Sequence, residues 1–533
     1  MKKALRILVV FLLIIATFVA AGCSKSLSQV KGDAPKKQSA LEPQPEINDP
    51  GDSFEYTVSG LFSDDMVLQR DKVINVWGFS SAANYGKYIY GELLGEKRYA
   101  EIDKNGEWKL EFSPKEASTQ PTTLAVYNKA GDRHEYNNVL IGDVWIVSGQ
   151  SNAEFMFKEM TVYYKDYENL VSENDNIRLF RQEYRDIQDH FVIDMEQSDV
   201  INPDYHWTKT TLDTVNDFSA AGYCFVKKLA ENTDIPQGIV MSCLGGRGIN
   251  FFMDSATLGS YAIYGGDNSV YKYLLAPLKH LIFQGVLFYQ GESDNEYNKA
   301  YAMLVSACVE GWRKAWDSDF SFYNIQCTSH AMLTRTFPGL PGLRAAQLEA
   351  YYKIPDSYLI STLDAGYRGL IGKNADGEDQ EEDYAHTFDK KTIGDRAADI
   401  ALSKLYKNGD YVYEYVACPI PTSVSWGSKT LTVKFTNVGD GLISYDGGEL
   451  KGFYVLDDYE QTEPAKAELV GKDTVKITFP EINGDVVGVA YAYEHSALPE
   501  EANLYNSNKV PCPTFRFFTD AFQKEIDERI NRG

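Results

Sequence analysis

Short apolar runs alternate with helical patterns through the middle of the chain, and this alternation restricts the fold more than any other feature of the sequence. Four runs are apolar along almost their whole length, at residues 144–147, 238–241, 285–289 and 358–360, and helical periodicity appears at residues 301–316, 343–352 and 391–406. Apolar strands that are separated by helices form parallel sheets with helices on both faces. The sequence therefore predicts an α/β domain of three layers over residues 141–408.

The segments on either side of this domain have β patterns. Residues 54–140 contain short strands separated by turn signals, among them Asp103-Lys104-Asn105-Gly106, which is typical of a β-hairpin. Apolar and polar residues alternate again after residue 408, for instance around Leu431 and Val433. We expect β-sandwich domains at residues 54–140 and 409–516, followed by a C-terminal helix at residues 517–533.

The N-terminus has the pattern of a bacterial lipoprotein signal. Cationic residues precede an apolar run that is too short to span a membrane comfortably, and small residues precede Cys23. We expect residues 1–22 to be removed, Cys23 to be lipidated, and the polar residues 23–53 to form a tether. Cleavage without lipidation, which gives a secreted protein, is the alternative. Both predict an extracytoplasmic protein, held at the cell envelope by the lipid anchor in the first case.

The composition argues against nucleic-acid binding. Lys and Arg total 52 and Asp and Glu total 76, so the net charge is −24. Nucleic-acid binding depends on neutralising phosphates with cations, and a strongly acidic chain repels them. We therefore expect no nucleic-acid partner, and contact with a membrane only through the lipid anchor.

The cysteines do not predict a metal site. Six remain after Cys23, they are widely scattered, and no Cys-x-x-Cys pair occurs. Cys418 and Cys512 each precede a proline and could form a disulfide outside the cell, or both could be buried thiols. Both alternatives stay open at this point.

The first chemically suggestive segment follows the run at residues 144–147. It reads Ser148-Gly149-Gln150-Ser151-Asn152-Ala153-Glu154. A serine at the turn from a buried strand into a helix exposes its hydroxyl group and lies beside backbone N–H groups that can stabilise an oxyanion. Ser151 is therefore a candidate nucleophile. The alternative is that Ser151 and Glu154 form a capping box at the start of a helix.

Two further segments follow apolar strands, where ligands of parallel sheets bind. Gly245 and Gly246 lie after the second run and let the backbone approach a ligand closely, although such pairs are often ordinary turns. Gln290 and Glu292 lie directly after the third run. A plain transition from strand to loop is the alternative for that segment.

A serine nucleophile needs a general base, and His386 is the best candidate among the seven histidines. Asp383 precedes it by three residues and can orient the imidazole, and the expected helix start after it favours the neutral ring. A surface Asp–His pair in an acidic loop is the alternative. No two histidines are four residues apart, and no phosphate-binding Gly-rich loop occurs, which argues against a zinc protease and a P-loop nucleotide enzyme.

Several motifs occur in order along the chain. They are Phe62-Ser63-Asp64-Asp65-Met66-Val67-Leu68-Gln69-Arg70, Gly142-Asp143-Val144-Trp145-Ile146-Val147-Ser148-Gly149-Gln150-Ser151-Asn152-Ala153-Glu154-Phe155, Tyr289-Gln290-Gly291-Glu292-Ser293, Asp383-Tyr384-Ala385-His386 and Asn503-Leu504-Tyr505-Asn506. Together they resemble the sialate O-acetylesterase family, a branch of the SGNH hydrolases. The resemblance implies a flavodoxin-like SGNH-hydrolase domain flanked by the β-sandwich domains.

The resemblance also implies roles for individual residues. It implies that Ser151 is the nucleophile, His386 the general base and Asp383 its orienting partner. The backbone N–H groups of Ser151 and Gly246 would form the oxyanion hole. SGNH enzymes usually add an Asn side chain from the third block, and we expect Gln290 to take that place here.

We further expect Asn152, Arg247 and Glu292 to contact the substrate. A sialate substrate carries a carboxylate that requires a cation, which Arg247 or Arg368 could supply. The resemblance implies no metal or organic cofactor.

The leading hypothesis is a carbohydrate esterase that removes O-acetyl groups from a glycan, with O-acetylated sialic acid as the expected substrate. An acetyl xylan esterase with the same mechanism is one alternative. A glycan-binding lipoprotein without activity is another, and its expected signature, the loss of Ser151, His386 or Asp383, is not found.

Overall fold

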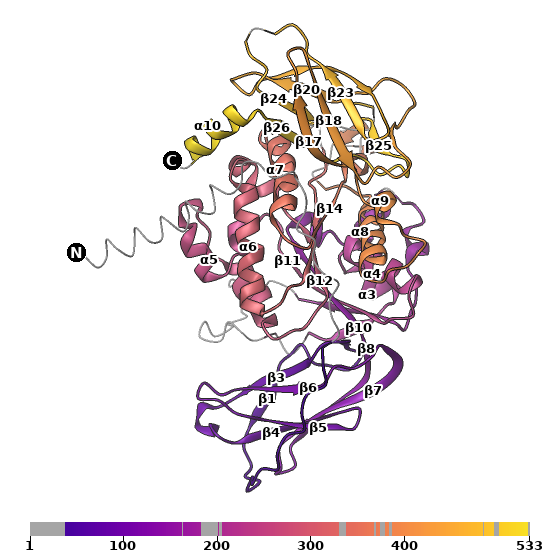
Figure 1. The fold of residues 1–533 in the computed structure, drawn as a ribbon. Helices are drawn as coiled ribbons and strands as arrows, with labels where there is room; N and C mark the ends of the chain where they lie inside the picture. Colours follow the sequence, from indigo (N-terminus) through magenta and orange to yellow (C-terminus); the bar gives the residue numbers. More distant parts are fainter. Residues whose placement is uncertain are drawn as a thin grey trace, which may run out of the picture.

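The computed structural model describes residues 38–530 except residues 163, 183–200, 202–204, 330–336, 367–368, 374–378, 383–385, 483 and 495–499. An α/β domain lies between two β domains, one formed by the N-terminal part of the chain and one by the C-terminal part (Figure 1). The order predicted from the sequence, β then α/β then β, is therefore confirmed.

The α/β domain is built on a sheet with the strand order β10-β9-β11-β8-β12-β13-β14. All neighbours in it are parallel except β10 and β9. The strands are β8 (Arg133–Gly149), β9 (Ile177–Arg181), β10 (Trp207–Lys209), β11 (Gln237–Cys243), β12 (Gly285–Tyr289), β13 (Ser321–Ile325) and β14 (Ser357–Ile360). Every residue of β11, β12 and β14 is buried, as expected of strands covered on both faces.

Helices cover both faces of this sheet. Trp145 and Leu287 point to the face covered by α4 (Ala220–Glu231) and α8 (Lys390–Lys404), and Ile146 and Phe288 point to the face covered by α6 (Tyr301–Trp316). The other α-helices in the described part of the domain are α2 (Ser151–Glu154), α3 (Leu212–Asn216), α5 (Ser255–Ser260) and α7 (Leu340–Lys353). Figure 1 shows α5, α6 and α7 on one side of the sheet and α3, α4 and α8 on the other. The predicted three-layer fold is therefore confirmed.

Strand β8 belongs to two domains at once. Its first part pairs with β7 and β2 in the N-terminal β domain, and its last part pairs with β11 and β12 in the α/β sheet. The N-terminal strands are β1 (Tyr56–Val58), β2 (Val67–Gln69), β3 (Ile74–Ser80), β4 (Tyr88–Leu93), β5 (Glu96–Glu101), β6 (Glu107–Phe112) and β7 (Ser118–Tyr127). The boundary expected after residue 140 thus falls inside one continuous strand.

The turn at Asp103-Lys104-Asn105-Gly106 forms, but it does not close a hairpin. Asp103 Oδ1 accepts hydrogen bonds from the backbone N–H groups of Asn105 and Glu107, at 2.8 Å each. Strand β5 then pairs with β4, whereas β6 pairs with β3 in the other sheet. The expectation of a hairpin was wrong because the turn crosses between the two sheets of a sandwich.

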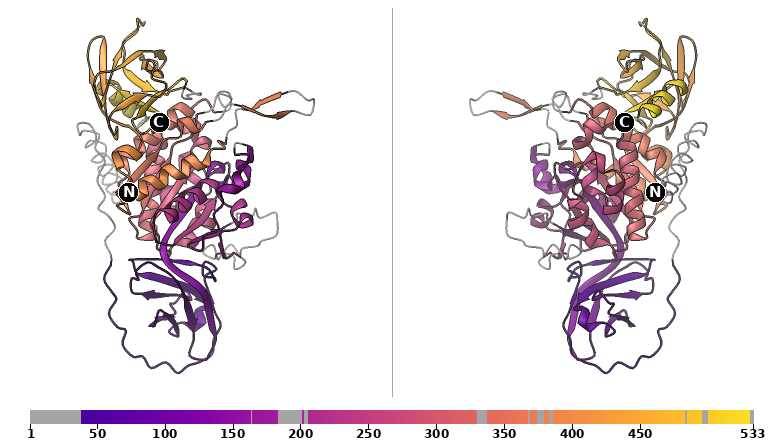
Figure 2. Two further views of the ribbon diagram at one scale, coloured as in Figure 1. Left: turned by 90° about the vertical axis from the view of Figure 1, so that its right-hand side faces the viewer. Right: turned by 90° about the vertical axis from the view of Figure 1, so that its left-hand side faces the viewer.

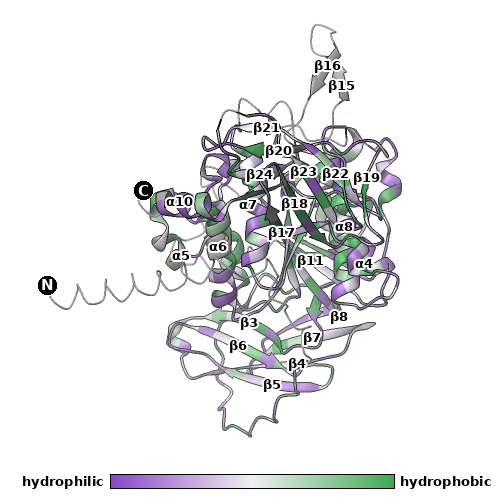
Figure 3. Cartoon of the chain, turned by 45° about the horizontal axis from the view of Figure 1, so that its top comes forward, coloured by the Kyte–Doolittle hydropathy of each residue, from purple (hydrophilic) through white to green (hydrophobic). Residues whose placement is uncertain are grey.

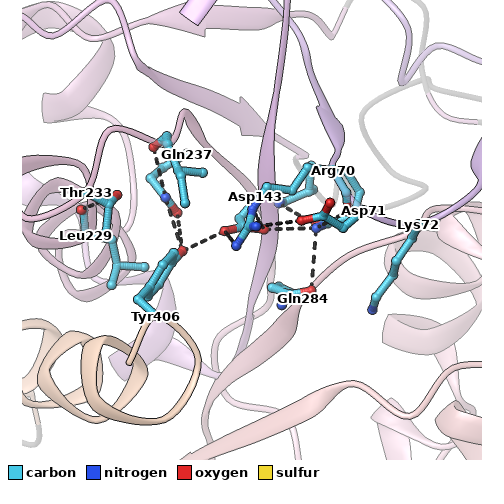
Figure 4. Close-up of polar contacts among 12 residues, drawn as sticks. Arg70, Asp71, Lys72, Asp143, Leu229, Thr233, Gln237, Gln284 and Tyr406 are labelled. Carbon is cyan, nitrogen blue, oxygen red and sulfur yellow. Dashed lines mark hydrogen bonds and ion pairs between the residues drawn. The ribbon is translucent and has the colours of Figure 1, made fainter. Parts of the chain in front are cut away.

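A buried polar cluster joins the N-terminal β domain to the α/β domain. Asp143 of β8 is fully buried, and its carboxylate accepts two hydrogen bonds from Arg70, at 3.0 and 3.1 Å. The same carboxylate accepts hydrogen bonds from Gln69 at 2.9 Å and from the Tyr406 hydroxyl at 2.8 Å. Figure 4 shows Asp143 between Arg70 on one side and Tyr406 on the other. A buried charge that is paired and hydrogen-bonded in this way fixes the orientation of the two domains.

Two antiparallel sheets form the C-terminal β domain and enclose one core. Their orders are β17-β18-β23-β22 and β21-β20-β24-β26. The strands are β17 (Ile420–Trp426), β18 (Thr430–Thr436), β19 (Leu442–Ser444), β20 (Phe453–Leu456), β21 (Thr462–Pro464), β22 (Lys466–Leu469), β23 (Thr474–Thr478), β24 (Gly488–Tyr491), β25 (Leu504–Asn506) and β26 (Phe515–Phe518). Val433 and Tyr491, from opposite sheets, belong to the same buried cluster. Hydrophobic residues run along β8, β11 and β18 in the interior (Figure 3).

Two short helices accompany this domain. They are α9 (Tyr413–Val416), which precedes it, and α10 (Asp520–Ile530), which follows it. The C-terminal helix was expected from residue 517, but residues 517 and 518 extend β26. No helix in the described parts of the chain is long and apolar enough to cross a membrane.

A narrow hairpin leads towards His386. Strands β15 (Gly369–Lys373) and β16 (Asp379–Glu382) pair with each other in antiparallel fashion. They stand out from the body of the α/β domain (Figure 2).

Cys418 and Cys512 carry free, buried thiols in the structure. The Cys418 thiol donates a hydrogen bond to the backbone carbonyl of Leu359, with a Sγ to O distance of 3.3 Å. Burial raises the pKa of Cys418 to about 12. Of the two alternatives from the sequence, buried thiols are therefore found.

Candidate active site

Ser151 lies at the sharp turn from β8 into α2. Gly149 ends β8 with a φ of +135°, and a Cβ atom there would lie 2.1 Å from the Tyr289 carbonyl oxygen, so only glycine fits. The N-cap residue of α2 is Gln150, and no side chain caps this helix. The capping-box alternative for Ser151 is therefore wrong, and its hydroxyl group has another partner.

That partner is His386. Its Nε2 atom lies 2.7 Å from the Ser151 Oγ atom, although the two residues are 235 positions apart. Burial, and next the positive charge of Lys390, lower the pKa of His386 to about 4. The imidazole is therefore neutral near pH 7 and can accept the serine proton. Asp383, its expected orienting partner, lies outside the described residues.

Two backbone N–H groups beside Ser151 are available to an incoming oxygen atom. Those of Ser151 and Gly246 donate to no acceptor in the described parts of the chain, whereas that of Gly245 donates to Glu154 Oε2 at 2.8 Å. Gly246 has a φ of +70°, and a Cβ atom there would meet nothing within 4 Å. The space beside these two N–H groups is therefore open, which is compatible with the predicted oxyanion hole.

Gln290 does not direct an amide hydrogen into the space beside the N–H groups of Ser151 and Gly246. It is fully buried, and its Nε2 atom donates to Asp294 Oδ2 at 2.5 Å and to the Arg247 carbonyl at 3.1 Å. Asp294 Oδ2 also accepts a hydrogen bond from the Ile249 N–H group at 2.8 Å. The expected role of Gln290 as a third oxyanion donor does not fit this arrangement. Gln290 and Asp294 instead hold the loop that carries Gly246.

Glu292 and Asn152 do not fit the expected role of substrate contacts either. Both are buried, and the Asn152 Nδ2 atom donates to Glu292 Oε1 at 2.7 Å. The other carboxylate oxygen of Glu292 accepts a hydrogen bond from Gln150 Nε2 at 2.7 Å. Glu292 thus holds both residues that flank Ser151. Burial raises the pKa of Glu292.

Lys390 is a site residue that the sequence reasoning missed. It is the first residue of α8, its side chain is fully buried, and its Nζ atom donates to Asn152 Oδ1 at 2.5 Å. The ammonium group lies 4.8 Å from the ring centre of Tyr289 and 4.9 Å from that of Phe155. Burial lowers its pKa to about 7, against the opposing effect of Glu292. The available signal was its position four residues after His386, at the start of the helix that follows.

Arg247 remains a candidate for binding substrate. Its guanidinium group lies 5.2 Å from the ring centre of Phe251, and its Nε atom has no hydrogen-bond partner in the described structure. None of the ion pairs found there includes it. Arg368 and Cys23 lie outside the described residues.

Comparisons with known proteins indicate a carbohydrate esterase. Residues 141–368 match the family model described as carbohydrate esterase, sialic acid-specific acetylesterase. The chain is 22% identical to the sialate O-acetylesterase of Homo sapiens, over 87% of this chain and 93% of the human protein. It is 21% identical to the sialate O-acetylesterase of Mus musculus, over 84% of this chain and 92% of the mouse protein.

A solved structure shares the fold. The crystal structure of a carbohydrate acetylesterase from Xanthomonas citri superposes with a TM-score of 0.72 at 24% identity, covering 87% of this chain and 100% of that one. The match extends over the flanking β domains as well as the α/β domain. Residues 141–368 of this protein thus match the model of the sialic acid-specific acetylesterases, a carbohydrate esterase family, and the protein is an ester hydrolase.

Proposed function

We propose that this protein is a serine carbohydrate esterase that removes O-acetyl groups from glycans, with O-acetylated sialic acid as its substrate. The observation that carries the proposal is the 2.7 Å contact between Ser151 Oγ and His386 Nε2, beside two backbone N–H groups that donate to no acceptor among the described residues. A nucleophile, a neutral base and oxyanion donors are the parts that acyl transfer requires.

In the first half of the reaction, Ser151 Oγ attacks the acetyl carbonyl carbon while His386 Nε2 accepts the serine proton. The carbonyl oxygen becomes an oxyanion, which the N–H groups of Ser151 and Gly246 stabilise. The bond to the sugar oxygen then breaks, and His386 returns the proton to that oxygen. The deacetylated sugar leaves, and an acetyl group remains on Ser151.

In the second half, His386 takes a proton from water as the water attacks the acetyl-enzyme. The tetrahedral intermediate collapses, acetate leaves, and the proton returns to Ser151 Oγ. Asp383 would orient the imidazole through Nδ1, as the resemblance implies.

Arg247 supports the choice of sialate over a neutral sugar. It is a cation without an ion-pair partner in the described structure, it adjoins Gly246, and the guanidinium group matches a carboxylate in geometry. Sialic acid carries such a carboxylate, whereas acetylated xylan offers none on its acetylated xylose units. Two relatives are named as sialate O-acetylesterases, which also favours this substrate.

We further propose that the protein acts outside the cytoplasmic membrane. The cationic start, the apolar run and Cys23 support removal of residues 1–22 and lipidation of Cys23, and residues 23–53 would then act as a tether. A Cys23→Ser variant should move from the membrane fraction to the soluble extracytoplasmic fraction. An unchanged distribution would contradict the lipid anchor.

The experiment that tests the function measures acetate release from a generic acetyl ester, O-acetylated sialic acid and acetylated xylan. The parent, Ser151→Ala and Arg247→Gln are compared. We expect Ser151→Ala to lose activity on all three, and Arg247→Gln to lose at least about tenfold in kcat/KM on the sialate alone. Equal losses of the Arg247 variant on all substrates would contradict carboxylate recognition. A faster reaction of the parent with xylan would favour the xylan alternative.

A further inference from the structure

Three elements that carry the site are joined by a buried chain of polar groups. Lys390 of α8 donates to Asn152, Asn152 donates to one oxygen of Glu292, and Gln150 donates to the other oxygen. We name Lys390, Asn152, Glu292 and Gln150 the clamp. Both immediate neighbours of Ser151 belong to it. The clamp therefore ties the nucleophile loop to the helix that follows His386.

The clamp contains a buried cation and a buried carboxylate, and burying these groups is costly. Lys390 is fully buried, and Glu292 is only 4% exposed. Replacing such a pair by apolar residues of similar size is often neutral or stabilising, so stability alone does not account for it. Its position around Ser151 points to a role in the reaction.

We propose that Lys390 is a positioning residue of the esterase reaction, which holds Ser151 through Asn152 and Glu292 and acts on His386 through its charge. This proposal rests on the proposed function. Lys390 does not contact Ser151, so its effect on the nucleophile passes through the clamp. A displacement of about 1 Å at a nucleophile costs on the order of a hundredfold in rate.

The charge of Lys390 has a second, separable effect. Lys390 lies four residues after His386, and both side chains lie near the Phe155 ring, the Lys390 Nζ atom at 4.9 Å and the centre of the His386 ring at 6.4 Å from its centre. Its charge opposes protonation of the imidazole. The charged and titratable groups that act on Lys390 from the surrounding elements are Glu292, Glu159, Asp389 and Cys327. Removing the lysine charge therefore raises the pKa of His386. Because the base acts only when neutral, the acidic limb of the pH–rate profile then moves to higher pH.

The test compares the full-length parent with Lys390→Met, which keeps an unbranched side chain of nearly the same length and removes its charge. With p-nitrophenyl acetate, we expect kcat to fall by about tenfold to a hundredfold with KM changed less than about threefold. The acidic limb of kcat/KM should move up by about one pH unit. An unchanged kcat, or an unmoved limb, would overturn the proposal.

Lys391→Met is the matched control. Lys391 is the next residue, is 39% exposed and pairs with Asp395 on the surface of α8. It should leave kcat and the acidic limb as in the parent. An equal effect of both variants would show a general disturbance of α8 and would overturn the specific role of Lys390.

The double variant Lys390→Met with Glu292→Gln keeps the proposal testable if the single variant fails to fold, because it removes both buried charges together. Residues that act as one unit are not additive, so the double variant should be no more than about threefold less active than Glu292→Gln alone. Multiplied losses would mean independent residues and would contradict the clamp.

Ser151→Ala distinguishes a failure of the proposed esterase function from a failure of the proposed role of Lys390. If the parent does not hydrolyse acetyl esters, or Ser151→Ala hydrolyses them equally well, the proposed function fails. If the parent is active, Ser151→Ala is inactive and Lys390→Met matches the parent in kcat and pH profile, only the inference about Lys390 fails.

Discussion

Replacing Gly149 with alanine tests the turn that presents Ser151. The new Cβ atom would lie 2.1 Å from the Tyr289 carbonyl oxygen and 3.0 Å from the Ala153 Cβ atom. Ordinary contacts to a Cβ atom start near 3.4 Å, so β8 and β12 must separate by about 1 Å where they carry the site. The same carbonyl oxygen accepts the Gln150 N–H group at 3.1 Å, and this bond would be stretched or lost.

The expected cost follows from these distances. A non-glycine residue at a φ of +135° costs about 1–3 kcal/mol, and overpacking adds about 1–3 kcal/mol, so the free energy of unfolding should fall by about 2–6 kcal/mol. A shift of about 1 Å at Ser151 should lower kcat on the order of a hundredfold. Urea unfolding and acetate release from a generic acetyl ester measure the two effects.

Gly131→Ala is the control for this prediction. Gly131 has a φ of +108° in a turn of the N-terminal domain, and a Cβ atom there would meet nothing within 4 Å. Gly131→Ala should lower the free energy of unfolding only by the cost of the backbone conformation, about 1–3 kcal/mol, and should leave kcat unchanged. The reasoning is refuted if Gly149→Ala is as stable and as active as Gly131→Ala.

Three further predictions follow from the site and the core. The pKa of His386 is lowered to about 4, and the base acts in its neutral form. The kcat/KM for an acetyl ester should therefore stay level from about pH 7 to about pH 5 and fall only at lower pH. A fall of kcat/KM centred near pH 6.5 would contradict this prediction. Asp294→Ala removes the acceptor for the Ile249 N–H group, so it should loosen the loop that carries Gly246. Steady-state kinetics should then show kcat lowered about tenfold. A kcat equal to that of the parent would contradict this role of Asp294. Cys418 and Cys512 should both be alkylated after unfolding without reductant, as peptide mass spectrometry would show, and protection of either would reveal a disulfide.

The sequence predicted the sheet and its helices because they have strong periodic patterns. The strand at residues 285–289 and the helix at residues 301–316 have the bounds that were expected. Strands β9 and β13 were missed, since a polar or charged residue interrupts each: Arg178 in β9 and Asn324 in β13. Both residues are buried, so burial in the fold outweighs the local pattern.

For the candidate active site, the sequence indicated which residues lie together better than it indicated what each of them does. Ser151 and His386 were found because each adjoins an element boundary and matches a family motif, and the structure brings them together. The roles of Gln290 and Glu292 depend on which polar groups face them in three dimensions, which the sequence does not contain. Lys390 was missed for the same reason, since a lysine at the start of a helix is usually solvated.

The most direct test of the central claim is the detection of the acetyl-enzyme. The protein is mixed with an acetyl ester, quenched in acid during turnover, digested and analysed by mass spectrometry. The peptide that contains Ser151 should gain the mass of one acetyl group, and this adduct should be absent from Ser151→Ala, which should also release no acetate. Ester hydrolysis by a Ser151→Ala protein at the parent rate, or an acetyl adduct on another residue during turnover, would contradict the account.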